Sequence, residues 1–323
     1  FKLYAPEVLD SFRELVATGC VELLCETYSH SLAALSSKED FTEQVKAHMA
    51  MLKKEFGVKP KAFRNTELIY SDEIGAMVGE LGFKTILAEG AKHVLGWKSP
   101  DYVYASAGDQ SLRVLLRNYK LSDDIAFRFS NQGWDEYPLT ADKYAQWVND
   151  AEGEVVNLFM DYETFGEHQK ATTGIFDFMK ALPKALLNAG VKFATVSETA
   201  AEHQPVAVIH CPHVMSWADE ERDITAWLGN DLQNEAFAKI YELKDKVRSL
   251  KSEDFNYVWN FMQTSDHFYY MATKWLSDGD VHSYFNPYGS SYEAFINYMN
   301  VLSDFQIEVE KALAAKKSRK KSK

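Results

Sequence analysis

The amino-acid sequence predicts an α/β fold that is followed by a helical segment. Short apolar runs alternate with longer stretches in which apolar residues recur at helical spacing, and Gly57, Gly82 and Gly190 stand where such stretches end. After about Pro212, strand-like runs become few and helical patterns take over. Strands that alternate with helices in this way favour a parallel sheet, either open or closed into a barrel.

The same patterns place each element in order along the chain. Short apolar runs predict strands at residues 20–26, 61–65, 85–89, 112–117, 155–161 and 192–196. Helical spacing predicts helices at residues 39–56, 72–81, 141–151 and 175–189, and later within 221–250, 255–275 and 292–315. We therefore expect a β/α domain over residues 1–211, a helical bundle over 212–315 that lines its cleft, and a basic, disordered tail over 316–323.

The composition of the 323-residue chain narrows the classes of protein to consider. Hydrophobic residues make up 46%, enough for a sizeable core, but no apolar run reaches about 18 residues, so no membrane span is expected. The net charge is −12 even though the tail holds six basic groups, and so acidic a body disfavours nucleic-acid binding. Cys20, Cys25 and Cys211 are too few and too scattered for a disulfide framework, which favours free thiols and a cytoplasmic location.

An apolar run near the middle of the chain ends abruptly in polar residues. Residues 155–160 are mostly apolar, and Asp161, Glu163, Glu167 and His168 follow them. A buried strand that surfaces into acidic groups can hold a carboxylate still while the loop reaches a substrate. The alternative interpretation is a strand that runs into a solvated acidic loop.

A second run, over residues 61–70, has the same form. A short apolar stretch contains Arg64 and Asn65 and leads to Glu67. Two carboxylates on different strand ends suit glycoside hydrolysis, because one attacks the anomeric carbon and the other protonates the leaving oxygen. The alternative for Glu67 is an acidic residue at a helix N-terminus, where the helix dipole favours it.

Together with three other segments, these runs resemble glycoside hydrolase family 57, the α-amylase-type family that acts on α-glucans. The resemblance covers nearly the whole chain and keeps the order of the family's motifs. The matching segments are residues 19–31 for the second motif, 64–70 for the third, 161–168 for the fourth, 216–230 for the fifth, and 263–268 for a later segment. The first motif, His-Gln-Pro, is expected to be absent from the chain, since residues 203–205 carry it only after the fourth motif and are interpreted as a chance match.

The resemblance implies a parallel barrel of seven strands, here incomplete because its N-terminal strand is missing. It also implies that Glu67 is the nucleophile of a retaining mechanism and that Asp161 is the general acid and base. Other residues are expected to bind substrate, with a structural ion pair, a satisfied histidine or core packing as the alternative: Glu22, His30, Arg64, Glu163, Trp217, Trp227, Asp266 and His267. If the strand persists past Asp161, Glu163 points to the same side as Asp161. Core positions are expected for Trp147, Trp259 and Trp275.

The sequence thus predicts a retaining enzyme acting on α-glucans such as starch, glycogen or malto-oligosaccharides, by hydrolysis or by transfer to a sugar hydroxyl. Two alternatives stay open: a non-catalytic, amylase-like α-glucan-binding protein, and a metal-dependent carbohydrate deacetylase on a related barrel. The chain lacks the paired-histidine spacings of a metal site, and residues 210–213 are too isolated to form one. No metal or cofactor, and no nucleic-acid or membrane partner, is therefore expected.

Overall fold

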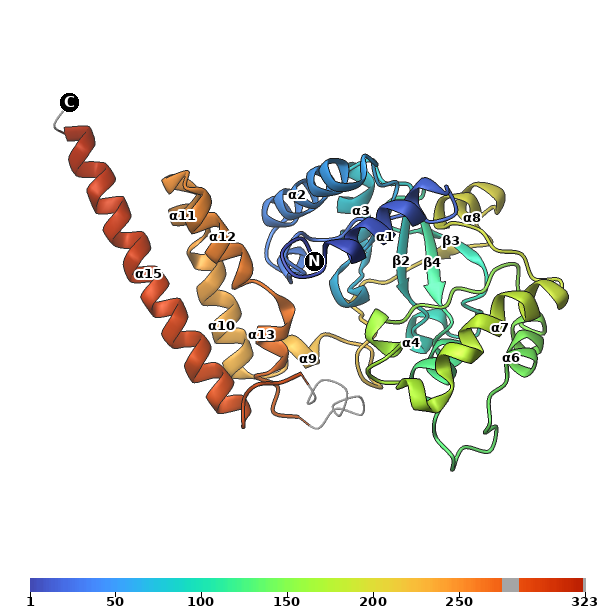
Figure 1. Ribbon diagram of the computed structural model, residues 1–323. Helices are drawn as coiled ribbons and strands as arrows, with labels where there is room; N and C mark the ends of the chain where they lie inside the picture. The colour runs from blue at the N-terminus through green and yellow to red at the C-terminus, as the bar shows by residue number, and fades with distance from the viewer. Residues whose placement is uncertain (275–284, 322–323) are drawn as a thin grey trace. The chain divides into compact units, whose positions relative to one another are not determined.

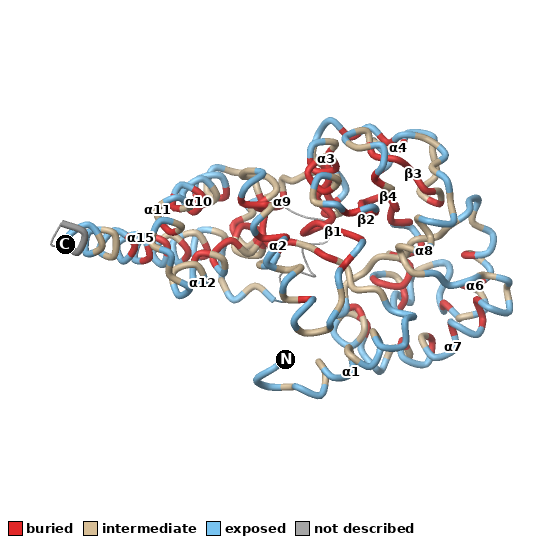
Figure 2. Tube along the Cα trace, turned by 90° about the horizontal axis from the view of Figure 1, so that it is seen from above, coloured by how far each residue is buried: buried red, intermediate tan, exposed pale blue. Residues whose placement is uncertain are grey.

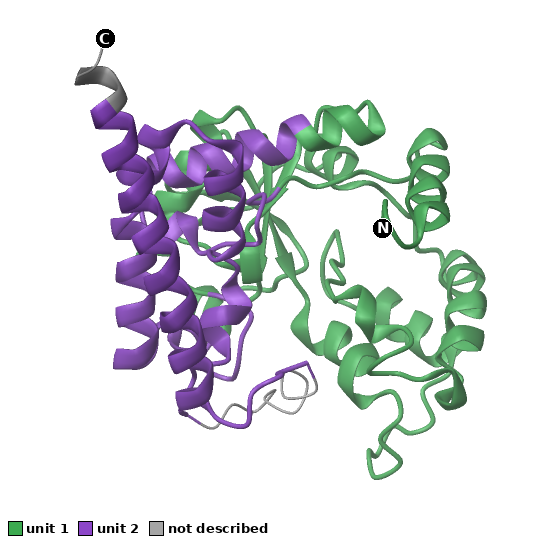
Figure 3. Cartoon of the chain, turned by 60° about the vertical axis from the view of Figure 1, so that its left-hand side comes forward, with its two compact units in different colours: residues 1–25, 51–215 green, residues 26–50, 216–323 purple. Residues whose placement is uncertain are grey.

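The computed structural model describes residues 1–274 and 285–321 (Figure 1). The chain divides into two compact units, coloured separately in Figure 3. Unit 1 comprises residues 1–25 and 51–215, and unit 2 comprises residues 26–50 and 216–323. The helix α2 (Lys38–Phe56) contributes residues to both units.

Unit 1 contains a five-stranded sheet in the order β1-β2-β4-β3-β5. β1, β2 and β4 run parallel, whereas β3 is antiparallel to β4 and parallel to β5. The strands are β1 (Ala62–Arg64), β2 (Thr85–Glu89), β3 (Val103–Ser106), β4 (Arg113–Arg117) and β5 (Val208–Ile209). The three central strands are buried almost throughout, as the red tube in Figure 2 shows.

The expected all-parallel, seven-stranded barrel is not what the described residues form. Their sheet has five strands, is open and is mixed. The reason lies between residues 103 and 117, where only the second half was expected to be a strand. β3 and β4 are joined by a short turn, in which the N–H of Ser106 donates to the carbonyl of Leu112 at 3.0 Å. So short a connection permits only an antiparallel pair, because a parallel pair needs a long crossover.

Three further expected strands do not form ladders. Residues 20–26 contribute one bridge, Cys25 to Phe63, and residues 155–161 are extended but are not a strand. Residues 192–195 lead into helix α8 (Val196–Glu202), because Thr195 and Glu198 form a capping box that starts a helix there. Apolar character alone could not distinguish an extended segment with one or two hydrogen bonds from a paired strand.

Two expected helices of unit 1 begin at a side-chain cap. α3 (Asp72–Glu80) begins at Ser71 and α6 (Ala141–Asn149) begins at Thr140, and each cap side chain accepts a backbone N–H. α6 packs beside α7 (Ile175–Asn188) over a shared apolar cluster, and the two lie side by side in Figure 1. Three further helices were not expected, namely α1 (Pro6–Ala17), α4 (Lys92–Leu95) and α5 (Tyr119–Asp123).

Unit 2 is helical, as expected for the C-terminal segment. Its helices after residue 216 are α9 (Thr225–Leu228), α10 (Asp231–Glu242), α11 (Lys244–Leu250), α12 (Glu253–Phe261), α13 (Ser265–Tyr269) and α15 (Ser291–Lys321). α15 packs on α10 and α11 through a stripe that includes Tyr298, Leu302, Phe305 and Val309. The expected disorder of the tail is wrong for residues 316–321, which continue α15. Lysine and arginine form helices readily and suit the negative end of the helix dipole.

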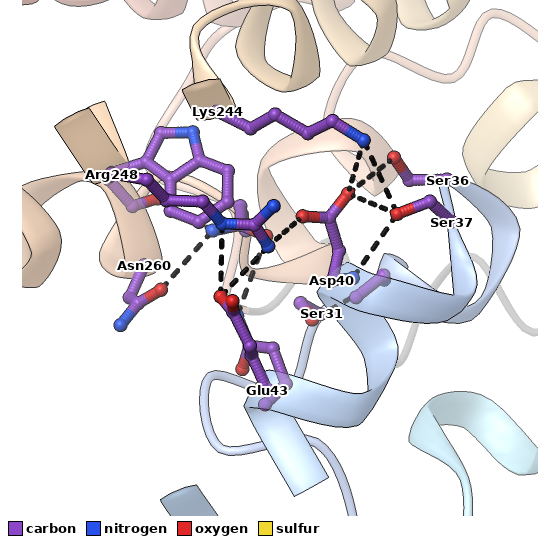
Figure 4. Close-up of polar contacts among 12 residues, drawn as sticks. Ser31, Ser36, Ser37, Asp40, Glu43, Lys244, Arg248 and Asn260 are labelled. Carbon is purple, nitrogen blue, oxygen red and sulfur yellow. Dashed lines mark hydrogen bonds and ion pairs between the residues drawn. The ribbon is translucent and has the colours of Figure 1, made fainter. Parts of the chain in front are cut away.

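A buried carboxylate joins two helices of unit 2 (Figure 4). The side chain of Asp40, near the start of α2, is fully buried and accepts from Arg248 of α11 at 2.6 Å. Lys244 of α11 lies 3.5 Å away, and the hydroxyls of Ser36 and Ser37 donate at 3.1 and 2.7 Å. A buried charge must be compensated in this way, so the network fixes α11 against α2. No helix in the described part of the chain combines the length and the apolar character needed to cross a membrane.

Candidate active site

The carboxyl end of β1 leads into a tight turn that carries Glu67. The turn η2 (Thr66–Leu68) begins two residues after β1, and Glu67 (φ 56°) and Leu68 (φ 52°) both have left-handed backbone conformations. That conformation costs a non-glycine residue about 1–2 kcal/mol. Glu67 is only 7% exposed. Strain of this kind gathers at functional sites, where it persists because the surrounding structure imposes it.

Neighbouring residues hold the turn in place. The side-chain amide of Asn65 donates to the carbonyl of Ile69 at 3.0 Å. Directly after the turn, Tyr70 and Met215 exchange two backbone hydrogen bonds of 2.9 Å each. The amide oxygen of Asn65 is buried and has no hydrogen-bond partner within residues 1–274 and 285–321. A buried acceptor of this kind costs free energy, so the turn is not optimised for stability alone.

Asp161 follows an extended segment that is anchored at the end of β4. The carbonyl of Asn157 accepts from the N–H of Asn118 at 2.9 Å, and the N–H of Phe159 donates to the hydroxyl of Ser122 at 3.2 Å. Asp161 is half-exposed. The carboxylate thus comes directly after a segment that is hydrogen-bonded to the rigid part of the sheet.

Arg64 connects the two carboxylate-bearing segments. It is the last residue of β1, three positions before Glu67, and its guanidinium lies 3.9 Å from the carboxylate of Asp161. This distance is too long for a hydrogen bond but short enough for a favourable Coulomb interaction. The structure therefore brings the segments that carry Glu67 and Asp161 together at the carboxyl end of β1.

A buried ionic network lies at the same ends of the parallel strands. Arg117, the last residue of β4, is 4% exposed, and it donates to Glu89, the last residue of β2, at 3.1 Å. It also donates to Asp123 at 2.5 Å and to the carbonyl of Phe159 at 2.8 Å. Glu89, fully buried, accepts in addition from the N–H of Gly90 at 2.7 Å. One guanidinium thus ties two strands, a helix and the segment that leads to Asp161.

The geometry around Glu163 and Glu22 differs from the expectation. Residues 162–164 form the 3₁₀ turn η4 (Tyr162–Thr164), so the strand does not persist and the argument that Glu163 and Asp161 share one side is wrong. Glu163 is exposed. Glu22 accepts from both the N–H and the hydroxyl of Ser197, in the first turn of α8. These bonds give Glu22 a structural place as an anion at a helix N-terminus, which differs from the ion pair that was its expected alternative.

Two of the expected segments come together in unit 2. Ser31 forms a bridge with Thr264, and the N–H of Ser265 donates to the carbonyl of His30 at 2.9 Å. This places His30 beside the start of α13, which carries Asp266 and His267. His30 has φ 48°, and its ring nitrogen Nδ1 lies 3.1 Å from a carboxylate oxygen of Glu26.

His267 behaves as a packing residue. Its ring centroid lies 5.4 Å from that of Tyr298 and 6.1 Å from that of Phe261. Burial lowers the pKa of His267, with partial compensation from a backbone hydrogen bond at Phe261 and from the charge of Asp266.

The tryptophans divide between core and loop. Trp227 is 1% exposed and packs against Tyr269, so its expected role as a platform for a sugar is wrong in this conformation, because neither face is accessible. Trp217 is half-buried in a loop that Arg222 ties through the carbonyl of Trp217. Trp259 is buried and Trp147 packs on the cluster shared by α6 and α7, as expected, whereas Trp275 lies outside the described residues.

Sequence reasoning missed Glu89 and Arg117. Both end runs that were correctly predicted as strands, at residues 85–89 and 112–117. A charged residue that closes a fully apolar run was therefore available as a signal. The parallel pairing of β2 with β4, which sets Glu89 opposite Arg117, could not be identified from the sequence. Within the described ranges, no group of three or more histidine, cysteine, aspartate or glutamate side chains is arranged to hold a metal ion.

Comparison with known proteins places this arrangement in a family. The model of glycosyl hydrolase family 57 matches residues 1–212. A protein of Methanocaldococcus jannaschii, provisionally named as an alpha-amylase, is 46% identical over 319 residues, which cover 95% of this chain and 68% of the relative. The chain therefore belongs to glycosyl hydrolase family 57 and is a glycoside-hydrolase-type enzyme.

Solved structures share the fold. The family 57 branching enzyme of Thermococcus kodakaraensis has a TM-score of 0.66 at 16% identity, over 96% of this chain and 73% of that structure. The 4-alpha-glucanotransferase of Thermococcus litoralis has a TM-score of 0.64 at 16% identity, over 83% of this chain and 47% of that structure. At such identities the similarity establishes the fold alone.

Proposed function

We propose that this enzyme acts on α-glucans by a retaining, double-displacement mechanism in which Glu67 is the nucleophile and Asp161 the general acid and base. The observation that carries the proposal is the strained turn that holds Glu67 at the end of β1, together with the approach of Arg64 to Asp161. The α-amylase, branching and glucanotransferase names of the similar proteins support α-glucans as the substrate class.

The first displacement requires an ionised and immobile nucleophile. Glu67 attacks the anomeric carbon as the bond to the leaving oxygen breaks, and Asp161 gives that oxygen its proton. A β-linked glycosyl ester on Glu67 results. The two carboxyl groups must then stand about 5–5.5 Å apart in the competent state, as in other retaining enzymes. The fixed backbone of the turn keeps Glu67 from retreating during the attack.

The second displacement decides between hydrolysis and transfer. Asp161, now ionised, removes a proton from the incoming hydroxyl, and the oxygen attacks the anomeric carbon and frees Glu67. Attack by water completes hydrolysis, and attack by a sugar hydroxyl completes transfer. The guanidinium of Arg64 lies 3.9 Å from the carboxylate of Asp161 and attracts it electrostatically once Asp161 has given up its proton.

Replacement of the nucleophile tests the proposal. Glu67→Gln should lose turnover of malto-oligosaccharides by several orders of magnitude while the fold survives, because the amide cannot attack. Added azide should restore turnover and give a glycosyl azide of inverted configuration. Glu73→Gln, the same substitution at an exposed position of α3, is the matched control and should keep full activity. Near-normal turnover by Glu67→Gln would overturn the assignment.

Two of the other site residues fit the same proposal. We propose that His30 and Asp266 bind substrate hydroxyls, which is supported by the hydrogen bonds that bring their segments together. A cytoplasmic location is kept as part of the proposal and is supported by the free thiols of all three cysteines. A glucan-binding protein without catalysis would show binding but no turnover, and a deacetylase would lose its activity to a chelator.

A further inference from the structure

Arg117 has a contact that its role in charge neutralisation does not require. Its guanidinium is almost wholly buried, and two of its nitrogens already serve Glu89 and Asp123. The remaining nitrogen, Nε, donates to the carbonyl of Phe159 at 2.8 Å. Because a guanidinium is planar and rigid, its two carboxylate contacts fix the direction of that third bond.

The carbonyl of Phe159 lies two residues before Asp161. The N–H of the same residue is held by the hydroxyl of Ser122, at 3.2 Å, so Phe159 is hydrogen-bonded on both sides. Asp161 itself is half-exposed and is followed by the turn η4. Arg117 therefore holds, two residues before Asp161, a backbone group that is fixed to the buried end of the sheet.

We propose that Arg117 is a positioning residue for the general acid, which it holds in place through the carbonyl of Phe159. The inference rests on the proposed function of Asp161. Arg117 acts by fixing the segment from which Asp161 projects. Lysine cannot replace it, because an ammonium group is a point donor and cannot serve two carboxylates and a carbonyl at fixed angles.

Substrates with different leaving groups can show whether Arg117 positions the general acid or only supports the fold. A sugar alkoxide leaves only if Asp161 protonates its oxygen, whereas a nitrophenolate departs with the bonding electron pair and needs no proton. Azide then attacks the glycosyl ester on Glu67 without a general base, releases the carboxylate and gives an azide of retained configuration. A displaced Asp161 should therefore impair the natural linkage and spare the aryl linkage in the presence of azide.

The experiment compares Arg117→Lys with the parent enzyme on a malto-oligosaccharide and on a nitrophenyl α-maltoside with azide. We expect kcat on the oligosaccharide to fall about 10–100-fold, the scale of a displacement of about 1 Å. We expect the nitrophenyl reaction to change by less than about threefold. Arg128→Lys is the matched control, because Arg128 also pairs with an aspartate and a carbonyl, at 2.7 and 2.8 Å, but has no bond to residues 155–161.

A variant of the proposed general acid, Asp161, is the reference for this comparison. Asp161→Asn should show the same selective loss on the oligosaccharide, and near-UV circular dichroism of each variant reports whether the fold is kept. A selective loss in both Arg117→Lys and Asp161→Asn supports the inference. Equal loss on both substrates in Arg117→Lys, or no loss, with a selective loss in Asp161→Asn, overturns the inference alone. Absence of selectivity in Asp161→Asn overturns the general-acid assignment and the inference with it.

Discussion

Each unit contains a buried ionic network around a single charged residue, and the two networks are built in opposite ways. In unit 1 the buried hub is a cation, Arg117, whose partners are a buried carboxylate, Asp123 and a main-chain carbonyl. In unit 2 the hub is an anion, Asp40, whose cations Arg248 and Lys244 are 26% and 29% exposed. The partners in unit 1 are rigid and the partners in unit 2 are long and flexible.

The difference shows what each network can do. Long cations at a surface can be replaced by water or by one another, so the network of Asp40 fixes which helices pack but not the position of any one atom. A buried guanidinium with short partners determines position to a fraction of an ångström. If Asp161 is the general acid, as we propose, the network of Arg117 serves chemistry, whereas the network of Asp40 serves the assembly of helices.

Removal of the arginine from each network should give the largest difference in stability between them. Arg117→Leu takes the cation from fully buried Glu89 and should lower the free energy of unfolding by about 3–5 kcal/mol. Arg248→Leu leaves Asp40 with Lys244 and two serine hydroxyls and should cost only about 1–2 kcal/mol. Urea denaturation of both variants measures the difference.

An exposed arginine provides the control for both variants. Arg13 pairs with Asp10 and Glu55 but is 41% exposed, so Arg13→Leu should leave the urea midpoint unchanged. A larger loss in Arg248→Leu than in Arg117→Leu would contradict the view that the cation hub is the costlier one to remove.

The parts of the fold that sequence could predict are those set by local chemistry. β2 and α3 are found where the apolar run and the helical spacing that ends at Gly82 placed them, because each signal acts within a few residues. β3 was missed, and with it the mixed topology, because pairing of β3 with β4 depends on a turn whose residues resemble any loop. Closure of the sheet is likewise a property of partners far apart in the sequence.

The candidate site follows the same division. The two carboxylate-bearing segments could be identified from residue order, and the contact between Arg64 and Asp161 brings them together. The side chain of Glu163 could not be oriented, because a 3₁₀ turn replaces the strand one residue after Asp161. Trp227 could not be recognised as buried, because an aromatic ring at helical spacing suits a sugar platform and a core equally well.

Acidification should destabilise unit 2 through two of its histidines. Burial lowers the pKa of His48, whose Nδ1 accepts the N–H of Glu26 at 2.9 Å in its neutral form. Since the folded state binds the proton less readily than the unfolded state, the contribution is complete above about pH 6.5 and is lost as the pH falls below it. The lowered pKa of His267 acts in the same direction. The free energy of unfolding should therefore decline between about pH 6.5 and 5.

The slope of the free energy of unfolding against pH tests this prediction. His48→Gln offers an amide oxygen to the same N–H and does not titrate, so its stability should depend less on pH than that of the parent protein. His93→Gln changes an exposed histidine of unit 1 and should retain the parent's slope. Identical slopes for all three proteins would show that His48 is not the source.

The smallest effect should come from an ion pair on the same helix as Arg248. Lys246 of α11 lies 3.1 Å from Glu310 of α15, and the two side chains are 43% and 53% exposed. The hydrogen bond from Lys246 holds the pKa of Glu310 below its usual value, but water and salt screen so exposed a pair. Glu310→Gln should leave the urea midpoint unchanged, because Leu302, Phe305 and Val309 supply the buried area that holds α15. If Glu310→Gln lowered the free energy of unfolding as much as Arg248→Leu does, α15 would be held by surface charge. The burial of an ion pair would then be a poor guide to its contribution.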